Sequence, residues 1–250
     1  MISKDFLRKY YQKEGEAFIH QKMLYQSITE FGYLNMERKK VLFSILKRKR
    51  IQRFLDIGCA EGHYVISMAK KGCFSIGIDI SLPKVKRAEA RNIEKTKFLL
   101  ADAEDLPFKA NSFDIVLMTE LLEHLLYPLK ALKEAKRVSK KWILLSVPLF
   151  KSEYAHNKQF QEVGLGHLRD YTSELIYRQL DSLDLRIATK ISIGHCNRIG
   201  ISKILIKLFK MAHFPLKLLL ELIYKIIDPI FFKISLLENK GTFLIINSYK

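Results

Sequence analysis

Three aspartates end short apolar runs of the chain at intervals that suit the binding of a single ligand. They are Asp56, Asp79 and Asp102, and the first opens a glycine-rich stretch, Asp56-Ile57-Gly58-Cys59-Ala60-Glu61-Gly62. A glycine-rich turn lets the backbone pass close to a bound ligand, because glycine has no Cβ. An acid beside that turn favours a cationic ligand and would repel a pyrophosphate. This stretch therefore indicates a ligand that carries a positive charge.

The other two acids are placed to hold the parts of a nucleoside. Asp79 follows the glycine-rich stretch at the spacing where a carboxylate accepts hydrogen bonds from both ribose hydroxyls. Asp102 stands where a further carboxylate can accept from the exocyclic amine of adenine. Each acid alone would equally fit a helix N-cap or a turn. Three acids at successive strand ends favour a cofactor site.

The elements that must position these acids are short apolar strands alternating with amphipathic helices. Strands are expected at Arg53–Ile57, Ser75–Asp79, Lys97–Ala101, Ile115–Met118 and Trp142–Val147, and helices near Tyr64–Lys71, Leu82–Asn92 and Pro128–Ser139. This alternation predicts an α/β fold with right-handed βαβ units, a parallel sheet and helices on both faces. Ligands then bind at the carboxyl ends of the strands. A helix near Ser173–Leu183 and strands near Leu185–Ile193 and Thr242–Ser248 complete the pattern.

Two other segments flank or interrupt this core, which we assign to residues 51–196 and 241–250. Residues 1–50 form an N-terminal helical cap, with helices expected at Glu16–Phe31 and Met36–Leu46. Residues 197–240 form an amphipathic helical insertion, because charges at helical spacing mark a narrow polar stripe on apolar helices. This insertion holds no run of about 20 uncharged residues, so we do not expect it to span a membrane. Contact with a membrane surface is expected, with packing under the domain or in a homodimer as alternatives.

The composition of the chain indicates which partners it could bind and in which cellular compartment it is expected. The formal net charge of +17 favours an anionic partner such as nucleic acid or acidic lipid, although a lysine-rich composition alone explains it equally well. The 3 cysteines form no Cys-x-x-Cys pair, which indicates a reducing cytoplasm. The charged segment from Met1 to Tyr11 lacks the apolar region of a signal peptide.

The stretch from about residue 53 to residue 150 resembles the class I S-adenosylmethionine-dependent methyltransferases, in particular the type 11 and ubiquinone-pathway O-methyltransferases. The residues that carry the resemblance are Asp56–Gly62, Ile78–Asp79, Ala101–Ala103, Phe113–Val116 with Glu120–His124, and Leu132–Val138 with Ser146–Pro148. The resemblance implies a Rossmann-like sheet of seven strands, the last antiparallel, and S-adenosylmethionine as cofactor.

By the same resemblance, Gly58 and Gly62 line the methionine moiety, Asp79 holds the ribose, and Asp102 with Ala103 holds the adenine. The full set of expected cofactor residues is Asp56, Gly58, Cys59, Gly62, Asp79, Ile80, Asp102, Ala103 and Glu120. Ala60 departs from the family, which usually has glycine there. We expect this alanine to alter the geometry of the loop without abolishing binding.

On the acceptor side, no Asn/Asp-Pro-Pro-Tyr/Phe sequence follows the fourth strand, which disfavours methylation of base amines. Glu120, Glu123 and His124 stand there instead, and on a helix they would cluster on one side and could converge on a cation. This arrangement resembles the metal site of ubiquinone-pathway O-methyltransferases and small-RNA 2′-O-methyltransferases, in which a downstream histidine completes the shell. His167 is the candidate for that role, with a divalent cation such as Mg²⁺.

Other roles for these residues stay open. His124 could orient the acceptor or act as a catalytic base without a metal, or the group could be structural. Tyr154, His156 and Tyr171 are expected to line the same pocket from their positions in the chain.

We therefore expect methyl transfer to an oxygen of a small or lipid-linked acceptor, such as a quinone precursor, a polyprenyl-linked sugar or a glycolipid. The expected location is the cytoplasm, with peripheral attachment to the inner membrane face through residues 197–240. Two alternatives are RNA 2′-O-methylation, which the charge favours although no RNA-binding module is evident, and a non-catalytic, cofactor-binding membrane or assembly subunit.

Overall fold

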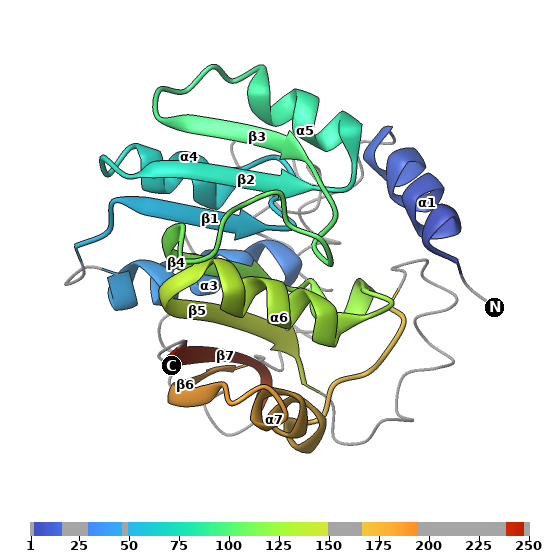
Figure 1. Ribbon diagram of the computed structural model, residues 1–250, viewed down its shortest axis with the longest axis vertical. Helices are drawn as coiled ribbons and strands as arrows, with labels where there is room; N and C mark the ends of the chain where they lie inside the picture. Colours follow the sequence, from blue (N-terminus) through green and yellow to red (C-terminus); the bar gives the residue numbers. More distant parts are fainter. Residues whose placement is uncertain (1–2, 17–29, 47–49, 150–166, 195–238, 248–250) are drawn as a thin grey trace, which may run out of the picture. The chain divides into compact units, whose positions relative to one another are not determined.

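A computed structural model of the chain describes residues 3–16, 30–46, 50–149, 167–194 and 239–247 (Figure 1). The chain divides into two compact units. The first comprises Met1–Phe18, Arg48–Ile191 and Thr242–Lys250, and the second comprises Ile19–Lys47 and Ser192–Gly241. Helix α3 (Glu30–Leu46) is the described helix of the second unit. All the candidate site residues discussed below belong to the first unit.

A seven-stranded sheet forms the centre of the fold, in the order β3-β2-β1-β4-β5-β7-β6 (Figure 1). The strands are β1 (Arg53–Ile57), β2 (Phe74–Asp79), β3 (Thr96–Leu100), β4 (Phe113–Thr119), β5 (Ser139–Pro148), β6 (Arg186–Gly194) and β7 (Asn239–Asn247). The pairings β1–β2, β2–β3, β1–β4 and β4–β5 are all parallel. The predicted α/β fold with a parallel central sheet is therefore confirmed.

The strand order places the candidate site. Strand β1 pairs with β2 on one side and with β4 on the other, so the chain order changes direction between β1 and β4. Open α/β sheets bind their ligands at such a switch point, in the crevice outside the carboxyl ends of the strands. The loops that follow β1 and β4 stand at this switch point, and they carry the glycine-rich stretch and the segment from Glu120 to His124.

Helices cover the sheet and leave its central strands buried. The described helices of the first unit are α1 (Lys4–Glu16), α4 (His63–Ala69), α5 (Leu82–Glu89), η1 (Leu122–His124), α6 (Pro128–Val138) and α7 (Ser173–Asp181). Helices α4 and α5 contact the β1–β3 side of the sheet, and α6 contacts β4 and β5. Phe54, Leu55 and Ile57 of β1 are completely buried, as expected for a parallel strand that is covered on both faces.

Most predicted bounds within the core lie within a few residues of the observed ones. Strand β7 begins at Asn239, three residues before the expected start, so the last two residues assigned to the insertion belong to a strand. The rest of the insertion, and residues 17–29 of the expected helix Glu16–Phe31, lie outside the described residues. In the part of the chain that is described, no helix has the length and apolarity that crossing a membrane requires.

Candidate active site

The loop after β1 has the backbone conformation that the glycine-rich stretch predicts. Gly58 and Gly62 both have φ of 76°, in the left-handed region. A Cβ at Gly58 would come within 2.9 Å of Cδ1 of Leu121, and a Cβ at Gly62 would overlap the ring of Phe98. Backbone N–H groups of Gly58 and Cys59 donate to the carbonyl oxygen of Ile78 at 2.8 and 2.9 Å. The loop is therefore packed closely against its neighbours and tied to the end of β2.

Ala60 adopts a left-handed conformation too, with φ of 45°. Side chains other than glycine pay about 1 kcal/mol or more for this region. Its backbone N–H donates to Oδ2 of Asp79 at 2.9 Å, which helps to hold the residue in place. Alanine thus keeps a conformation that suits glycine better.

Asp56 is the strongest indication that the site suits a cationic ligand. Its side chain is buried, and within the described chain neither of its carboxylate oxygens has a hydrogen-bond partner. Burial, together with the nearby charge of Asp79, raises the pKa of Asp56 to about 8. A buried carboxylate without a partner is costly, so this position fits a ligand that brings a positive charge.

Asp79 ends β2 and organises the turns on both sides of it. Its Oδ2 accepts from the N–H of Ala60 and its Oδ1 accepts from the N–H of Ser81, each at 2.9 Å. Burial raises the pKa of Asp79, although Lys84 and these two N–H groups act in the opposite direction. A carboxylate has about four acceptor positions, so hydroxyls of a ribose can still bind.

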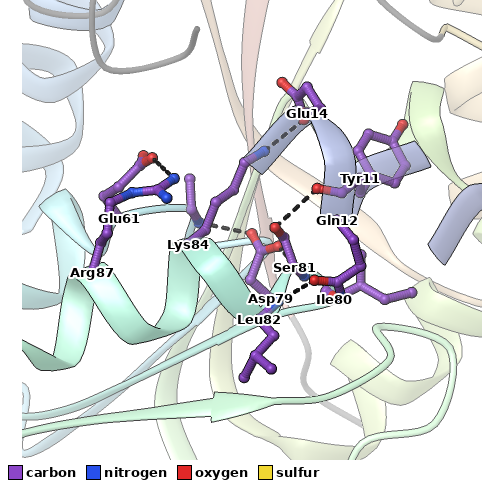
Figure 2. Close-up of polar contacts among 11 residues, drawn as sticks. Tyr11, Gln12, Glu14, Glu61, Asp79, Ile80, Ser81, Leu82, Lys84 and Arg87 are labelled. Carbon is purple, nitrogen blue, oxygen red and sulfur yellow. Dashed lines mark hydrogen bonds and ion pairs between the residues drawn. The ribbon is translucent and has the colours of Figure 1, made fainter. Parts of the chain in front are cut away.

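Helix α1 contacts the turn after β2, which the sequence did not predict (Figure 2). The amide of Gln12 donates to the carbonyl of Ile80 at 2.9 Å and accepts from the N–H of Leu82 at 3.1 Å. The hydroxyl of Ser81 donates to the carbonyl of Tyr11 at 2.9 Å. These bonds place α1 beside the residues expected to hold the ribose.

The first turn of α1 also engages the acids after β3. Nζ of Lys4 lies 3.0 Å from Oδ2 of Asp102 and 2.6 Å from Oε2 of Glu104, and Arg8 lies 3.8 Å from the same Asp102 oxygen. The other oxygen of Asp102 accepts from the N–H of Glu104 at 2.9 Å. Ala103 is buried between the two acids. Asp102, the expected adenine acceptor, therefore shares its carboxylate with cations of α1.

On the acceptor side, the structure brings together three of the four expected metal ligands. Donor atoms of Glu123, His124 and His167 lie within 4.8 Å of one another. Glu120 lies outside this group, and its Oε1 accepts from the hydroxyl of Ser146 at 3.0 Å. The helix expected to carry these residues is a short 3₁₀ turn, η1, because Glu120 has φ of 49° and helical geometry begins only at Leu122.

A row of rings joins α1 to this acceptor side. The ring of Tyr11 meets the imidazole of His124 edge-on at 6.0 Å, and His124 meets His167 at 4.7 Å between centroids. Tyr11 was missed because its partners, Ser81 and His124, are far away in the sequence. The expectation that Tyr171 lines the pocket is wrong, since it lies fully buried in the hydrophobic core. Tyr154 and His156 lie outside the described residues.

A closely packed glycine turn at the switch point of the sheet, beside a buried acid with no hydrogen-bond partner among the described residues, defines a Rossmann-like protein that binds a nucleoside cofactor with a cationic group. A profile of the methyltransferase domain matches residues 55–142. An uncharacterized protein of Methanocaldococcus jannaschii is 30% identical over 249 residues, which cover 99% of this chain and 98% of that protein. The chain belongs to the class I S-adenosylmethionine-dependent methyltransferases.

Two further comparisons agree with this family. Chloroplastic tocopherol O-methyltransferase of Arabidopsis thaliana is 36% identical over 99 residues, 37% of this chain and 28% of that protein. The structure of magnesium protoporphyrin IX methyltransferase from Synechocystis, with bound SAH, has the same fold, with a TM-score of 0.61 at 17% identity over 77% of this chain and 94% of the other. In seven other curated relatives the shared region spans 28% to 58% of the relative's own length, and these relatives include enzymes named for nitrogen as well as oxygen acceptors.

Proposed function

We propose that this methyltransferase acts on an oxygen of a small or lipid-linked acceptor, with His124 as the base. The observation that supports the proposal is the position of His124 at the carboxyl end of β4, half-buried and in contact with Tyr11 and His167. When bound, S-adenosylmethionine supplies a methyl group already activated by its positively charged sulfur. The protein then has to hold the acceptor in line and take up the proton of its hydroxyl.

The buried carboxylate of Glu123 suits His124 to that task. Oε1 of Glu123 lies 3.9 Å from Nε2 of His124. A negative charge on that side favours a proton on Nε2 and leaves Nδ1 to accept the proton of the acceptor hydroxyl. The same charge would stabilise the imidazolium after the transfer. The N–H of Leu168 donates to the carbonyl of Glu123 at 2.8 Å, which fixes the neighbouring chain beside this pair.

A divalent cation is the second arrangement that these residues allow. The spacing of Glu123, His124 and His167 suits one ion with mixed nitrogen and oxygen ligands. Such an ion would lower the pKa of an acceptor hydroxyl bound to it, and His124 would then be a ligand and not a base. Glu120 would take no part, because its carboxylate is engaged with Ser146.

The class of the acceptor molecule is proposed from a relative and from the composition of the chain, and not from the geometry of the site. A relative named for tocopherol, together with the expected apolar insertion at residues 197–240, favours a hydroxyl on an apolar body such as a quinone precursor. The net charge of +17 is the observation that keeps RNA 2′-O-methylation as the rival.

The test is transfer of tritiated methyl groups from S-adenosylmethionine into a cell extract divided into chloroform, nucleic-acid and small polar fractions. Counts in the chloroform or small polar fraction that fall at least 100-fold in His124→Ala support the proposal. Counts in RNA would replace it with the rival function. Asp79→Ala serves as the blank, and Glu174→Ala, an exposed position on α7, serves as the matched control.

The same assay separates the base from the metal. Activity that survives EDTA and responds to His124→Ala but little to His167→Ala identifies a base. Loss of activity in EDTA, restored by added Mg²⁺ or Mn²⁺ and abolished by both histidine substitutions, identifies a cation.

A further inference from the structure

The hydroxyl of Tyr11 is a buried donor whose partner is missing from the described residues. It is shielded from solvent and has no hydrogen-bond partner there. A tyrosine hydroxyl is protonated at neutral pH and can donate a hydrogen bond. An unmade hydrogen bond at a buried donor is costly, so this position indicates a bound group.

Helix α1 fixes the phenol at the junction of the two halves of the site. The carbonyl of Tyr11 accepts from Ser81 at 2.9 Å, and Nζ of Lys84 lies 5.9 Å over the tyrosine ring. On the other side, its ring contacts His124. Tyr11 thus stands between the residues expected to hold the ribose and the residue proposed to face the acceptor. The methyl group of the cofactor must reach the acceptor, so the methionine part of the cofactor lies between the residues expected to hold the ribose and His124.

One charged group of S-adenosylmethionine has no counterpart among the residues discussed above. Asp56 fits a cation, and Asp79 and Asp102 fit the ribose and the adenine. The methionine carboxylate is an anion, and the cations around this part of the described chain are engaged: Lys84 lies 2.8 Å from Glu14, and Lys4 bridges Asp102 and Glu104. A neutral donor is what an anion needs in a site already rich in carboxylates.

We propose that the hydroxyl of Tyr11 donates a hydrogen bond to the methionine carboxylate of the bound cofactor. Helix α1 is then part of the cofactor site, and Tyr11 is a cofactor-binding residue supplied from outside the Rossmann-like core. The proposal depends on cofactor binding alone and not on the identity of the acceptor.

The test compares two ligands by calorimetry: S-adenosylhomocysteine and its decarboxylated analogue, which keeps the amine and lacks the carboxylate. We expect Tyr11→Phe to weaken S-adenosylhomocysteine binding roughly 10-fold or more, because a hydrogen bond to a charged group is stronger than one between neutral groups. Binding of the decarboxylated analogue should change less than 2-fold. Tyr10→Phe, which alters the neighbouring phenol in the same helix, should change neither affinity.

Two outcomes would overturn the proposal. Equal weakening of both ligands by Tyr11→Phe would mean that Tyr11 acts only by holding α1 in place. Unchanged affinity for both would mean that the hydroxyl faces something other than the cofactor. Melting temperatures of the ligand-free variants, expected to lie close to that of the wild type, separate these results from a folding defect. Failure to find an acceptor for the enzyme would affect none of these measurements.

Discussion

The backbone N–H of Ala60 lies 2.9 Å from Oδ2 of Asp79, so the glycine-rich turn after β1 is tied directly to the acid that ends β2. The other oxygen of the same carboxylate accepts from the N–H of Ser81 at 2.9 Å. One side chain therefore sets the geometry of two turns that a nucleoside must contact together. This bond also explains how a residue other than glycine is kept at position 60.

Ala60→Gly should stabilise the protein by about 0.5 kcal/mol. Relief of the left-handed strain gains about 1 kcal/mol or more, and the added freedom of glycine in the unfolded chain removes part of that gain. Urea unfolding measures the difference. Ala90→Gly is the control, because Ala90 is exposed and has right-handed helical geometry. Ala90→Gly should lower the free energy of unfolding by about 0.5–1 kcal/mol. A decrease of the same size in Ala60→Gly would argue against strain at Ala60.

Gly62→Ala should lower the free energy of unfolding, measured in urea, by about 2–4 kcal/mol. The new methyl group would overlap the ring of Phe98, and alanine would also have to adopt a left-handed conformation. Gly72→Ala isolates the second effect. Gly72 has φ of 92°, and nothing lies within 4 Å of the Cβ that alanine would add. We expect Gly72→Ala to lower the free energy of unfolding by about 1–2 kcal/mol. Similar losses in the two variants would show that Phe98 moves aside without cost.

The stability of the ligand-free protein should fall as pH rises from about 4 to about 8. Burial raises the pKa of Asp56 to about 8 from its ordinary value of 3.8. Between these values the folded state holds a proton that the unfolded state has released, so the free energy of unfolding decreases with pH. Urea unfolding at pH 5 and pH 8 should show a smaller decrease in Asp56→Asn than in the wild type. Equal decreases would mean that Asp56 is ionised throughout.

Binding of S-adenosylmethionine should follow the opposite trend. A cation binds the ionised form of Asp56, so the affinity should rise by up to about tenfold per pH unit as pH approaches 8. Calorimetry in buffers of different ionisation enthalpy should detect the released proton near pH 7. The proton release should disappear in Asp56→Asn, and a variant that releases as much as the wild type would assign the proton to another group.

Removing Arg87 should destabilise the protein strongly, because Glu61 is completely buried and lies 2.9 Å from Nη2 of Arg87 (Figure 2). Arg87→Leu leaves that carboxylate without its cation, at a cost of about 3 kcal/mol. Adding Glu61→Gln should restore part of the loss. The exposed pair Arg178–Glu174 provides the control, since Arg178→Leu should change stability by less than about 1 kcal/mol. Thermal unfolding of the four proteins compares them directly.

The core could be predicted from residue 53 onwards because its central strands contain short apolar runs followed by polar turns. Asp56, Asp79 and Asp102 stand at or near the ends of β1, β2 and β3, and parallel pairing brings them to one edge of the sheet. Their individual environments could not be predicted in the same way. That Asp102 faces Lys4 depends on a helix almost 100 positions away in the chain. That the buried carboxylate of Asp56 has no hydrogen-bond partner among the described residues became evident only in the structure.

The contacts of helix α1 and the turn at Glu120 escaped prediction for different reasons. Of the α1 side chains, only Leu7 is buried, and the helix is held to the rest of its unit by polar bonds of Lys4, Gln12 and Glu14, whose distant partners the local pattern does not reveal. The segment from Glu120 to His124 has helix-forming residues. It is held instead by β5, whose Ser146 carbonyl accepts from the N–H of Glu120 at 3.0 Å. Such tertiary contacts override local preference.

The contacts of α1 also bear on the order in which the protein is made. Lys4 and Asp102 are separated by 98 positions, and both Tyr11 with Ser81 and Glu14 with Lys84 are separated by 70. During synthesis α1 leaves the ribosome before any of these partners exists, so it cannot make all of these contacts until β1, β2 and β3 have emerged. A helix that is made before the sheet is therefore docked after it, onto turns that the sheet strands must first bring together.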